Sequence, residues 1–293
     1  MIDNNEYDIT TISDFSSTIF YLGSFPILVY RDLKRRIKRY NRKQDISYSS
    51  FDSRFKKIYE SKYWEKSPSF QDCCFSKSIL GIDLTKSEKK IINGKLCKIS
   101  RYDYFKFNCA TILDLIKKNV ENETVVDFGC GYGIVLFALK ALNLKNPLEG
   151  YEMTEYGLQT ANAINDYFKA GINFEKIDLT KNFDMLELKG KTIFTHYVME
   201  ELKYDMQESI QNIINSKPKQ VLHFEPMFEI YNNNLRDLAR RTYLKCVDYQ
   251  RNLLSTLLMF EKEGKLKILD VNRMGIGGQP FDEISFIRWK PIN

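Results

Sequence analysis

Apolar and polar positions along most of this chain recur with the periods of strands and helices. Short apolar runs predict strands near 124–128, 148–152, 173–177, 191–195 and 219–224. Longer segments with helical spacing predict helices near 102–118, 133–143, 155–169, 199–215 and 247–263. Because strands and helices follow one another in turn, the pattern predicts an α/β fold with a mostly parallel sheet and helices on both faces.

The first hundred residues do not follow this alternation. Residues 51–62 have helical spacing, whereas residues 84–98 are polar and rich in turn-forming residues. Within the latter, Asn93-Gly94 favours a hairpin or another tight turn. We therefore expect an N-terminal helical appendage over 1–100 and one larger domain over 101–293.

A glycine-rich turn follows the first predicted strand, with the sequence Asp127-Phe128-Gly129-Cys130-Gly131-Tyr132-Gly133. The third glycine of this turn is Gly133. In a dinucleotide-binding turn, G-x-G-x-x-G, the third glycine would fall one position later, at Ile134. A carboxylate at Asp127 would repel a pyrophosphate but can pair with an ammonium group. Glu152 ends the second strand and can accept hydrogen bonds from ribose hydroxyls. S-adenosylmethionine, which has a cationic amino acid end and a ribose, therefore fits the pattern better than a dinucleotide.

The same turn resembles the first motif of class I S-adenosylmethionine-dependent methyltransferases. Other segments resemble later parts of that family in the same order: Glu152 at the ribose position, Phe174–Asp178 at the third strand, Lys191–Leu202 at the fourth and Gln220–Pro226 at the fifth. The resemblance covers roughly residues 105–291.

The resemblance implies a Rossmann-like sheet of seven strands, mostly parallel with an antiparallel last strand. Residues 266–273 and 283–289, joined by a glycine-rich turn, suit the antiparallel pair that closes such sheets. The cofactor S-adenosylmethionine would bind at the carboxyl ends of the parallel strands. The implied cofactor contacts are Tyr104, Asp127, Gly129, Cys130, Gly131, Gly133, Glu152, Met153, Asp178, Leu179 and Thr195.

Two residues are candidates for the catalytic step. His196 ends the fourth strand, where the methyl group should point, and histidine titrates near neutral pH. It is either a general base for a hydroxyl acceptor, a residue that lines the pocket, or a purely structural histidine. Glu225 ends the fifth strand and can orient an amine or hydroxyl acceptor, or pair with a basic residue nearby. His223, inside that strand, is expected to be buried and hydrogen-bonded.

Composition narrows the class of protein. Hydrophobic residues make up 43% of the 293 residues, which is enough to form a core. The six cysteines lack metal-ligand spacing and the chain has two histidines, so we expect no metal site. Acidic residues, not a basic segment, follow Met1, so we expect no secretory signal and a cytoplasmic location.

Positive charge is concentrated in one segment. Residues 31–43 contain eight basic residues and one acid, whereas the whole chain has a net charge of +6. The apolar stretch 18–30 precedes them and is shorter than the about 20 residues that span a bilayer. Three interpretations stay open for 18–43: a helical layer with a solvated basic face, a peripheral contact with the inner membrane face or a lipid-linked substrate, and an RNA-binding arm. Nucleic acid is disfavoured because no RNA-binding signature accompanies the charge.

The segment 227–247, between the fifth strand and its helix, is predicted to be a helical lid over the acceptor. Its basic residues form either a solvated face or a site for an anionic acceptor: Arg236, Arg240, Arg241 and Lys245.

The sequence as a whole predicts O-methylation, or with less support N-methylation, of a small molecule or a glycan or cell-envelope precursor. One alternative is an RNA methyltransferase that docks through 31–43. The other is a non-catalytic module that binds the cofactor and acts through protein contacts. The pattern does not indicate an oligomeric state.

Overall fold

A single large sheet organises the computed structural model, which describes residues 7–40, 49–79, 82–181, 186–202 and 206–292. In this part of the chain its strands lie in the order β1 (Thr10–Thr11), β5 (Lys95–Ser100), β4 (Ser87–Ile92), β11 (Leu266–Gly277), β12 (Glu283–Pro291), β10 (Gln220–Pro226), β9 (Thr192–His196), β6 (Val125–Phe128), β7 (Leu148–Glu152) and β8 (Asn173–Lys176). A separate small sheet pairs β2 (Ser78–Ile79) with β3 (Ile82–Asp83).

The strand order confirms the predicted α/β fold. β8, β7, β6, β9 and β10 are parallel, and β12 and β11 follow as an antiparallel pair. The chain runs outward from β6 to β8 and then returns to the other side of β6 for β9 and β10. The order therefore reverses between β6 and β9, the kind of switch point beside which ligands bind in open α/β sheets.

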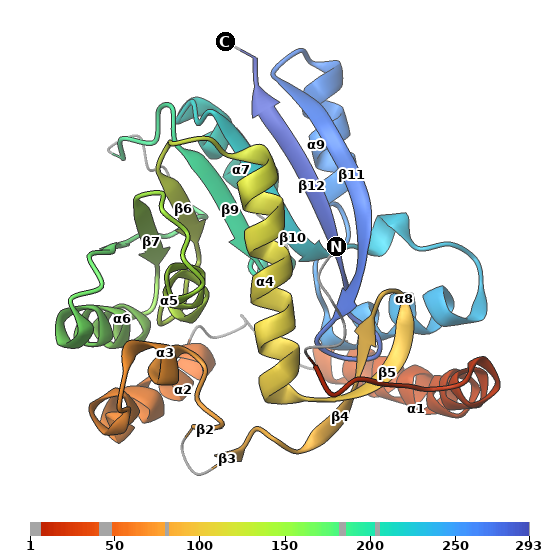
Figure 1. The fold of residues 1–293 in the computed structure, drawn as a ribbon. Helices are drawn as coiled ribbons and strands as arrows, with labels where there is room; N and C mark the ends of the chain where they lie inside the picture. Colours follow the sequence, from red (N-terminus) through yellow and green to blue (C-terminus); the bar gives the residue numbers. More distant parts are fainter. Residues whose placement is uncertain (1–6, 41–48, 80–81, 182–185, 203–205, 293) are drawn as a thin grey trace.

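Helices cover both faces of the sheet, as Figure 1 shows. One face carries α4 (Arg101–Asn119), α5 (Ile134–Ala141) and α6 (Glu155–Phe168), and the other carries α7 (Met206–Asn215) and α9 (Leu253–Lys262). Successive residues of a strand point to opposite faces of the sheet. Val125 packs in the core formed with α4, α5 and α6, and Val126 packs in the core formed with α7 and α9. This explains why the parallel strands are continuous apolar runs.

The first hundred residues are not only helical, which corrects the predicted helical appendage. They form α1 (Asp14–Tyr40), α2 (Ser49–Ser61), η2 (Tyr63–Lys66) and α3 (Phe70–Cys74), but β4 and β5 extend the main sheet beyond β11. The β4–β5 turn is Asn93-Gly94, with φ values of 51° and 73° as a type I′ hairpin requires. The division at residue 100 stays a prediction.

α1 continues through Pro26, although proline usually kinks or ends a helix. Proline removes the hydrogen bond to the carbonyl of Leu22, but both residues are exposed, so water can bond that carbonyl. The basic residues at 41–43 lie outside the described residues. None of the described helices is long and apolar enough to cross a membrane.

The remaining helical elements connect these layers. η3 (Met199–Glu201) follows β9, η4 (Phe228–Ile230) follows β10, and α8 (Leu235–Val247) follows η4. α8 packs along α1 at the side of the sheet (Figure 1). The predicted insertion is therefore helical, and its main contact is with the N-terminal helix.

Candidate functional site

The turn from β6 into α5 has a backbone that only glycine adopts readily. φ is 74° at Gly129, 58° at Gly131 and 79° at Gly133. A Cβ on Gly129 would lie 2.6 Å from Cγ1 of Val198, and one on Gly133 would lie 2.8 Å from the ring of Phe174. Both the conformation and the close packing therefore require glycine here.

Glu152, at the end of β7, is fixed by this turn. Its carboxylate accepts hydrogen bonds from the backbone N–H groups of Gly131 and Thr154, each at 2.8 Å. Gly157 of α6 permits the arrangement, because a Cβ there would lie 3.0 Å from Cγ of Glu152. A carboxylate has about four lone-pair positions, so two remain for a pair of hydroxyl donors.

The turn and Glu152 border a cavity of about 450 Å³ at the carboxyl ends of the parallel strands. This volume is within the range of small-molecule and cofactor sites. Six of the predicted cofactor residues line it: Gly129, Gly131, Glu152, Met153, Asp178 and Leu179. Residues from the ends of β6, β7 and β8 are thus brought to one place, as the strand pattern predicted.

The other predicted cofactor residues do not line this cavity. Asp127, Cys130 and Gly133 belong to the same turn, and Asp127 is 2% exposed. Thr195 is buried with its hydroxyl 2.9 Å from Nδ1 of His223. Tyr104 is buried on α4, and its ring centroid is 5.4 Å from Nζ of Lys90. Contacts from these residues to a cofactor stay predictions.

The N-terminal helix α2 supplies a wall that the sequence did not indicate. Arg54 and Phe55 line the cavity, and the Phe55 ring is 5.8 Å from that of Tyr132. Asp52 anchors α2 to α6 by accepting a hydrogen bond from the backbone N–H of Tyr156 at 2.9 Å. The only sequence signal was the apolar side of residues 51–62, which any packed helix would show.

The segment after β9 supplies a second unexpected wall. It contributes Tyr197, Val198, Glu200, Glu201 and Leu202, and Tyr249 approaches from beyond α8. Tyr197 has a φ of 57°, an uncommon conformation for a non-glycine residue. One oxygen of Glu200, Oε2, is buried and has no hydrogen-bond partner among the described residues. Glu200 is therefore a candidate functional group.

Several carboxyl groups in and behind the cavity hold their protons strongly. Burial raises the pKa of Asp127 well above its usual range, and Glu152 and Glu225 raise it further. Burial also raises the pKa of Glu200 well above normal, with added repulsion from Glu225 and Asp282. Burial raises the pKa of Glu225 to about 7, although Thr195 and backbone N–H groups including that of Val198 oppose the shift. Such a cluster favours a cationic ligand, which would offset the repulsion.

Asp178 has the opposite electrostatic character. Burial opposes its ionisation, but hydrogen bonds from Thr180 and the nearby Lys181 lower its pKa below the usual value. Thr180 donates from its hydroxyl at 2.6 Å and from its backbone N–H at 3.1 Å. Asp178 is therefore an ionised hydrogen-bond acceptor at the rim of the cavity.

The two histidines are both placed by neighbouring side chains. His196 ends β9 outside the cavity lining, and its Nε2 is 3.0 Å from Nδ2 of Asn108, a residue that sequence reasoning missed. Burial lowers the pKa of His196 to about 4. His223 is buried and hydrogen-bonded, as predicted: the indole N–H of Trp289 donates to its Nε2 at 2.9 Å. The proton of neutral His223 is therefore on Nδ1, facing Thr195.

The arginines of α8 are engaged by the protein itself. Arg236 pairs with Asp14 of α1 at 2.8 Å, and Arg240 pairs with Asp237 and Glu283 at 2.8 and 2.5 Å. Arg241 donates to the backbone carbonyl of Tyr231. No residue of α8 lines the cavity, so neither the predicted lid nor an anion site on this helix is supported by its contacts.

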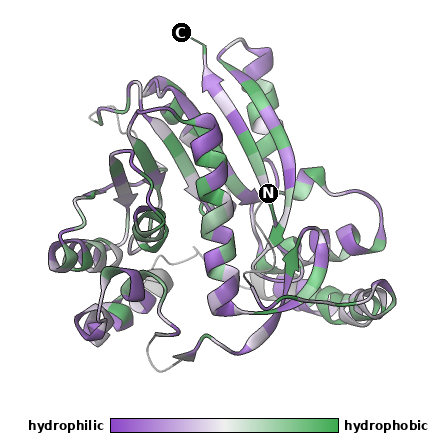
Figure 2. Cartoon of the chain, in the orientation of Figure 1, coloured by the Kyte–Doolittle hydropathy of each residue, from purple (hydrophilic) through white to green (hydrophobic). Residues whose placement is uncertain are grey.

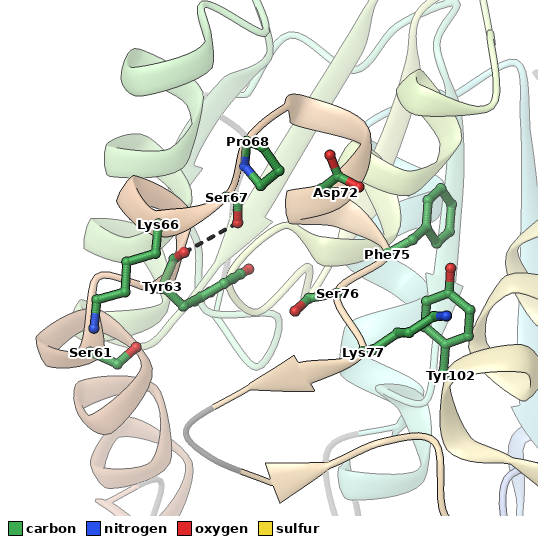
Figure 3. A pocket seen from close by; sticks show the side chains of 10 residues that line it. All are labelled: Ser61, Tyr63, Lys66, Ser67, Pro68, Asp72, Phe75, Ser76, Lys77 and Tyr102. Atoms are coloured by element: carbon green, nitrogen blue, oxygen red, sulfur yellow. Dashed lines mark hydrogen bonds between the residues drawn. The ribbon is translucent and has the colours of Figure 1, made fainter.

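A second cavity of about 600 Å³ lies between η2, α3 and the start of α4. Figure 3 shows its lining, which includes Tyr63, Lys66, Asp72, Phe75, Lys77 and Tyr102. Although it is larger, it contains neither the glycine turn nor an acid at a strand end. We therefore assign the candidate cofactor site to the smaller cavity.

Solved structures of S-adenosylmethionine-dependent methyltransferases are similar to this chain. Magnesium protoporphyrin IX methyltransferase from Synechocystis PCC 6803, solved with bound S-adenosylhomocysteine, is 13% identical over 64% of this chain and 84% of its own, with a TM-score of 0.47. A SAM-dependent methyltransferase from Aquifex aeolicus is 13% identical over 64% and 98%, with a TM-score of 0.43.

The PH0226 protein from Pyrococcus horikoshii OT3 is 12% identical over 64% of this chain and 91% of its own, with a TM-score of 0.48. No protein-family model and no curated protein matches the sequence. At these TM-scores the solved structures are only distantly similar to this chain. The fold is therefore described from the chain's own strand order.

Proposed function

We propose that this protein is a methyltransferase that uses S-adenosylmethionine. The observation that carries the proposal is the single cavity where the positive-φ glycine turn, Glu152 and Asp178 meet at the ends of three adjacent parallel strands. The residues present fit the cofactor, because its ribose needs a paired hydroxyl acceptor and its adenine amino group needs a second acceptor. Its sulfonium and ammonium groups suit the clustered carboxyl groups.

Each residue would then have one role in binding. Glu152 would accept from both ribose hydroxyls with the lone pairs that Gly131 and Thr154 leave available. Asp178 would accept from the adenine amino group. Met153 and Leu179, which border the same part of the cavity, would pack against the adenine ring. Asp127, behind the turn, would balance the charge of the ammonium group.

The bound cofactor supplies an electrophilic methyl group, so the protein mainly has to orient the acceptor and remove its proton. We infer an oxygen acceptor on a small molecule or a glycan precursor. His196 is the last residue of β9, and Glu225 is the last but one of the adjacent strand β10. With a pKa of about 4, His196 is a weak base that is better suited to orienting a hydroxyl. Glu200, which lines the cavity, is better placed to take its proton. Glu225 is fully buried behind the lining and accepts from the backbone N–H of Val198, so it would act by orienting that segment.

The test is a screen of sugar, nucleotide-linked and other hydroxyl acceptors with detection of S-adenosylhomocysteine. His196→Ala should bind S-adenosylmethionine normally, and Glu200→Gln should bind it more weakly because one acid of the cluster is lost. At saturating cofactor both variants should lose about 100-fold in turnover, as is typical for loss of a general base or an orienting group. Glu208→Gln, which changes an exposed glutamate on α7 outside the cavity lining, is the control. Full turnover in both variants would exclude these roles, and methylation confined to RNA would contradict the acceptor class.

A further inference from the structure

α1 exposes a continuous apolar stripe on its outer side. Its large members are each more than half exposed: Phe15, Ile19, Leu22, Tyr30 and Leu33. With the exposed Pro26 between Leu22 and Tyr30, these positions follow one another at three or four residues, the spacing of one helix face. The large members and Ile27 are half of the exposed large hydrophobic residues in the described part of the chain. In Figure 2, drawn in the orientation of Figure 1, hydrophobic colouring is visible on α1 at the edge of the molecule. Such concentration on one helix marks an interaction surface.

The fold does not need this stripe, because α1 is held by its other side. Tyr21 and Leu28 are buried there, and the Tyr21 hydroxyl donates to the carbonyl of Pro280 at 2.9 Å. Ion pairing of Asp14 with Arg236 fixes the start of the helix. The outer stripe is therefore available for another surface.

Positive charge borders the stripe. Arg31 and Lys34 of α1 are exposed. Nζ of Lys89, on β4, lies 4.1 Å from the ring centroid of Phe20, which places this lysine beside α1. Lys98 is directly opposite Lys89 in the hairpin, and both are exposed. Lys89 and Lys98 therefore place two adjacent positive charges beside α1.

We propose that the outer face of α1 lies on an anionic lipid bilayer. The stripe would enter the interface while the basic residues beside it contact acidic head groups, as in amphipathic helices that lie in the membrane plane. From Phe15 to Leu33 the stripe is about 27 Å long at 1.5 Å per residue, which suits a helix lying flat. A second copy of the chain is disfavoured, because a two-fold contact would present the same cations to the basic flank.

The position of α1 connects this surface to the candidate site. α1 lies at the end of the molecule toward which β6, β7 and β9 point (Figure 1). Its residue Tyr21 contacts the loop after β11, where Gly278 donates its backbone N–H to the hydroxyl of Tyr197 at 3.1 Å. Tyr197 lines the cofactor cavity. A protein lying on α1 would therefore turn its cavity end toward the lipid.

The test is co-sedimentation of the full chain with phosphatidylcholine vesicles that contain or lack phosphatidylglycerol. Wild type should bind the anionic vesicles, and added salt should weaken binding. Phe15→Asp with Leu22→Asp should lower the partition coefficient about tenfold or more. Arg31→Glu with Lys34→Glu should do the same while leaving the apolar stripe intact.

Two control variants make the result specific. Leu258→Asp on α9 alters a leucine about as exposed as Leu22, at 50% against 54%. Lys267→Glu with Lys290→Glu reverses two exposed, directly opposed lysines on β11 and β12. Both should bind like wild type. The proposal is overturned if wild type does not bind anionic vesicles or if the controls lose as much binding. It is also overturned if light scattering finds a dimer that Phe15→Asp with Leu22→Asp converts to a monomer.

Discussion

At the scale of single residues, His223 couples the stability of the sheet to pH. It bridges Thr195 and Trp289 across β9, β10 and β12, and burial lowers its pKa to about 3. In the unfolded chain a histidine titrates near about 6.5. Between these values the unfolded state binds the extra proton, so the stabilisation present above about pH 6.5 is lost as pH falls toward 3.

Replacing His223 by Gln should remove this dependence. The stability advantage of wild type over His223→Gln should shrink by up to about 1.4 kcal/mol for each pH unit below about 6.5. The measurement is urea unfolding of both proteins at several pH values between about 7 and 5. If the two stability curves run parallel, His223 does not titrate as its burial indicates.

At the scale of elements, α2 joins the N-terminal region to the candidate site. The Phe55 ring lies over the glycine turn, since a Cβ on Gly131 would be 3.1 Å from its Cζ. The same ring also packs against Tyr132 of the glycine turn. The helix should therefore contribute to cofactor affinity although it precedes the glycine turn by about 75 residues.

Phe55→Ala should weaken binding of S-adenosylmethionine about tenfold, because removing one partly buried aromatic contact costs about 1–2 kcal/mol. Stability should change little, since Phe55 is half-buried. Titration calorimetry measures the affinity, with Lys57→Ala on the exposed side of α2 as the control. Equal affinity for Phe55→Ala and wild type would show that α2 packs beside the site without contributing to it.

Some elements could be predicted from the sequence and others could not. The unit β6–turn–α5 was predictable because its positive φ angles restrict the residues to glycine, which leaves a visible spacing. The acids at 152 and 178 were predictable because parallel strands end at one edge of a sheet. β4 was not predicted, since Ser-Glu-Lys-Lys-Ile-Ile has the lysines and glutamate that strands usually lack.

Other features leave no local signal. The approach of Arg54 and Phe55 to Gly131, and of Asn108 to His196, depends on packing between segments that are distant in sequence. The sequence did not single out Glu200, which lies in a strand-to-helix connection. Its burial and its repulsion by Glu225 arise only in the folded chain. The arginines of α8 were assigned to an acceptor or to solvent. Arg240 has a local partner, Asp237 on the same helix, but Asp14 and Glu283 come from α1 and β12.

At the scale of the whole molecule, the buried acids around the cavity link the charge of a bound ligand to proton release. Burial raises the pKa values of Asp127, Glu200 and Glu225, and repulsion by Glu225 raises those of Asp127 and Glu200 further. A bound cation favours their ionised forms, so binding of S-adenosylmethionine should release protons.

The affinity for S-adenosylmethionine should accordingly rise as pH increases from about 5.5 toward the raised pKa values and then level off. Calorimetry in buffers of different ionisation enthalpy measures the proton release directly. S-adenosylhomocysteine, which lacks the sulfonium charge, should release fewer protons. Equal proton release by the two ligands would contradict an electrostatic role for the acid cluster.

The most direct test of the proposed function is calorimetric titration of S-adenosylmethionine into three proteins. Wild type should bind, and Glu152→Gln should bind about 100-fold more weakly, because two hydrogen bonds from ribose hydroxyls to a charged acceptor are worth about 3 kcal/mol or more. Glu149→Gln, on the same strand but paired with Lys191 at 2.8 Å, should bind like wild type. Absence of binding by folded wild-type protein, or equal losses in the two variants, would contradict the cofactor site described here.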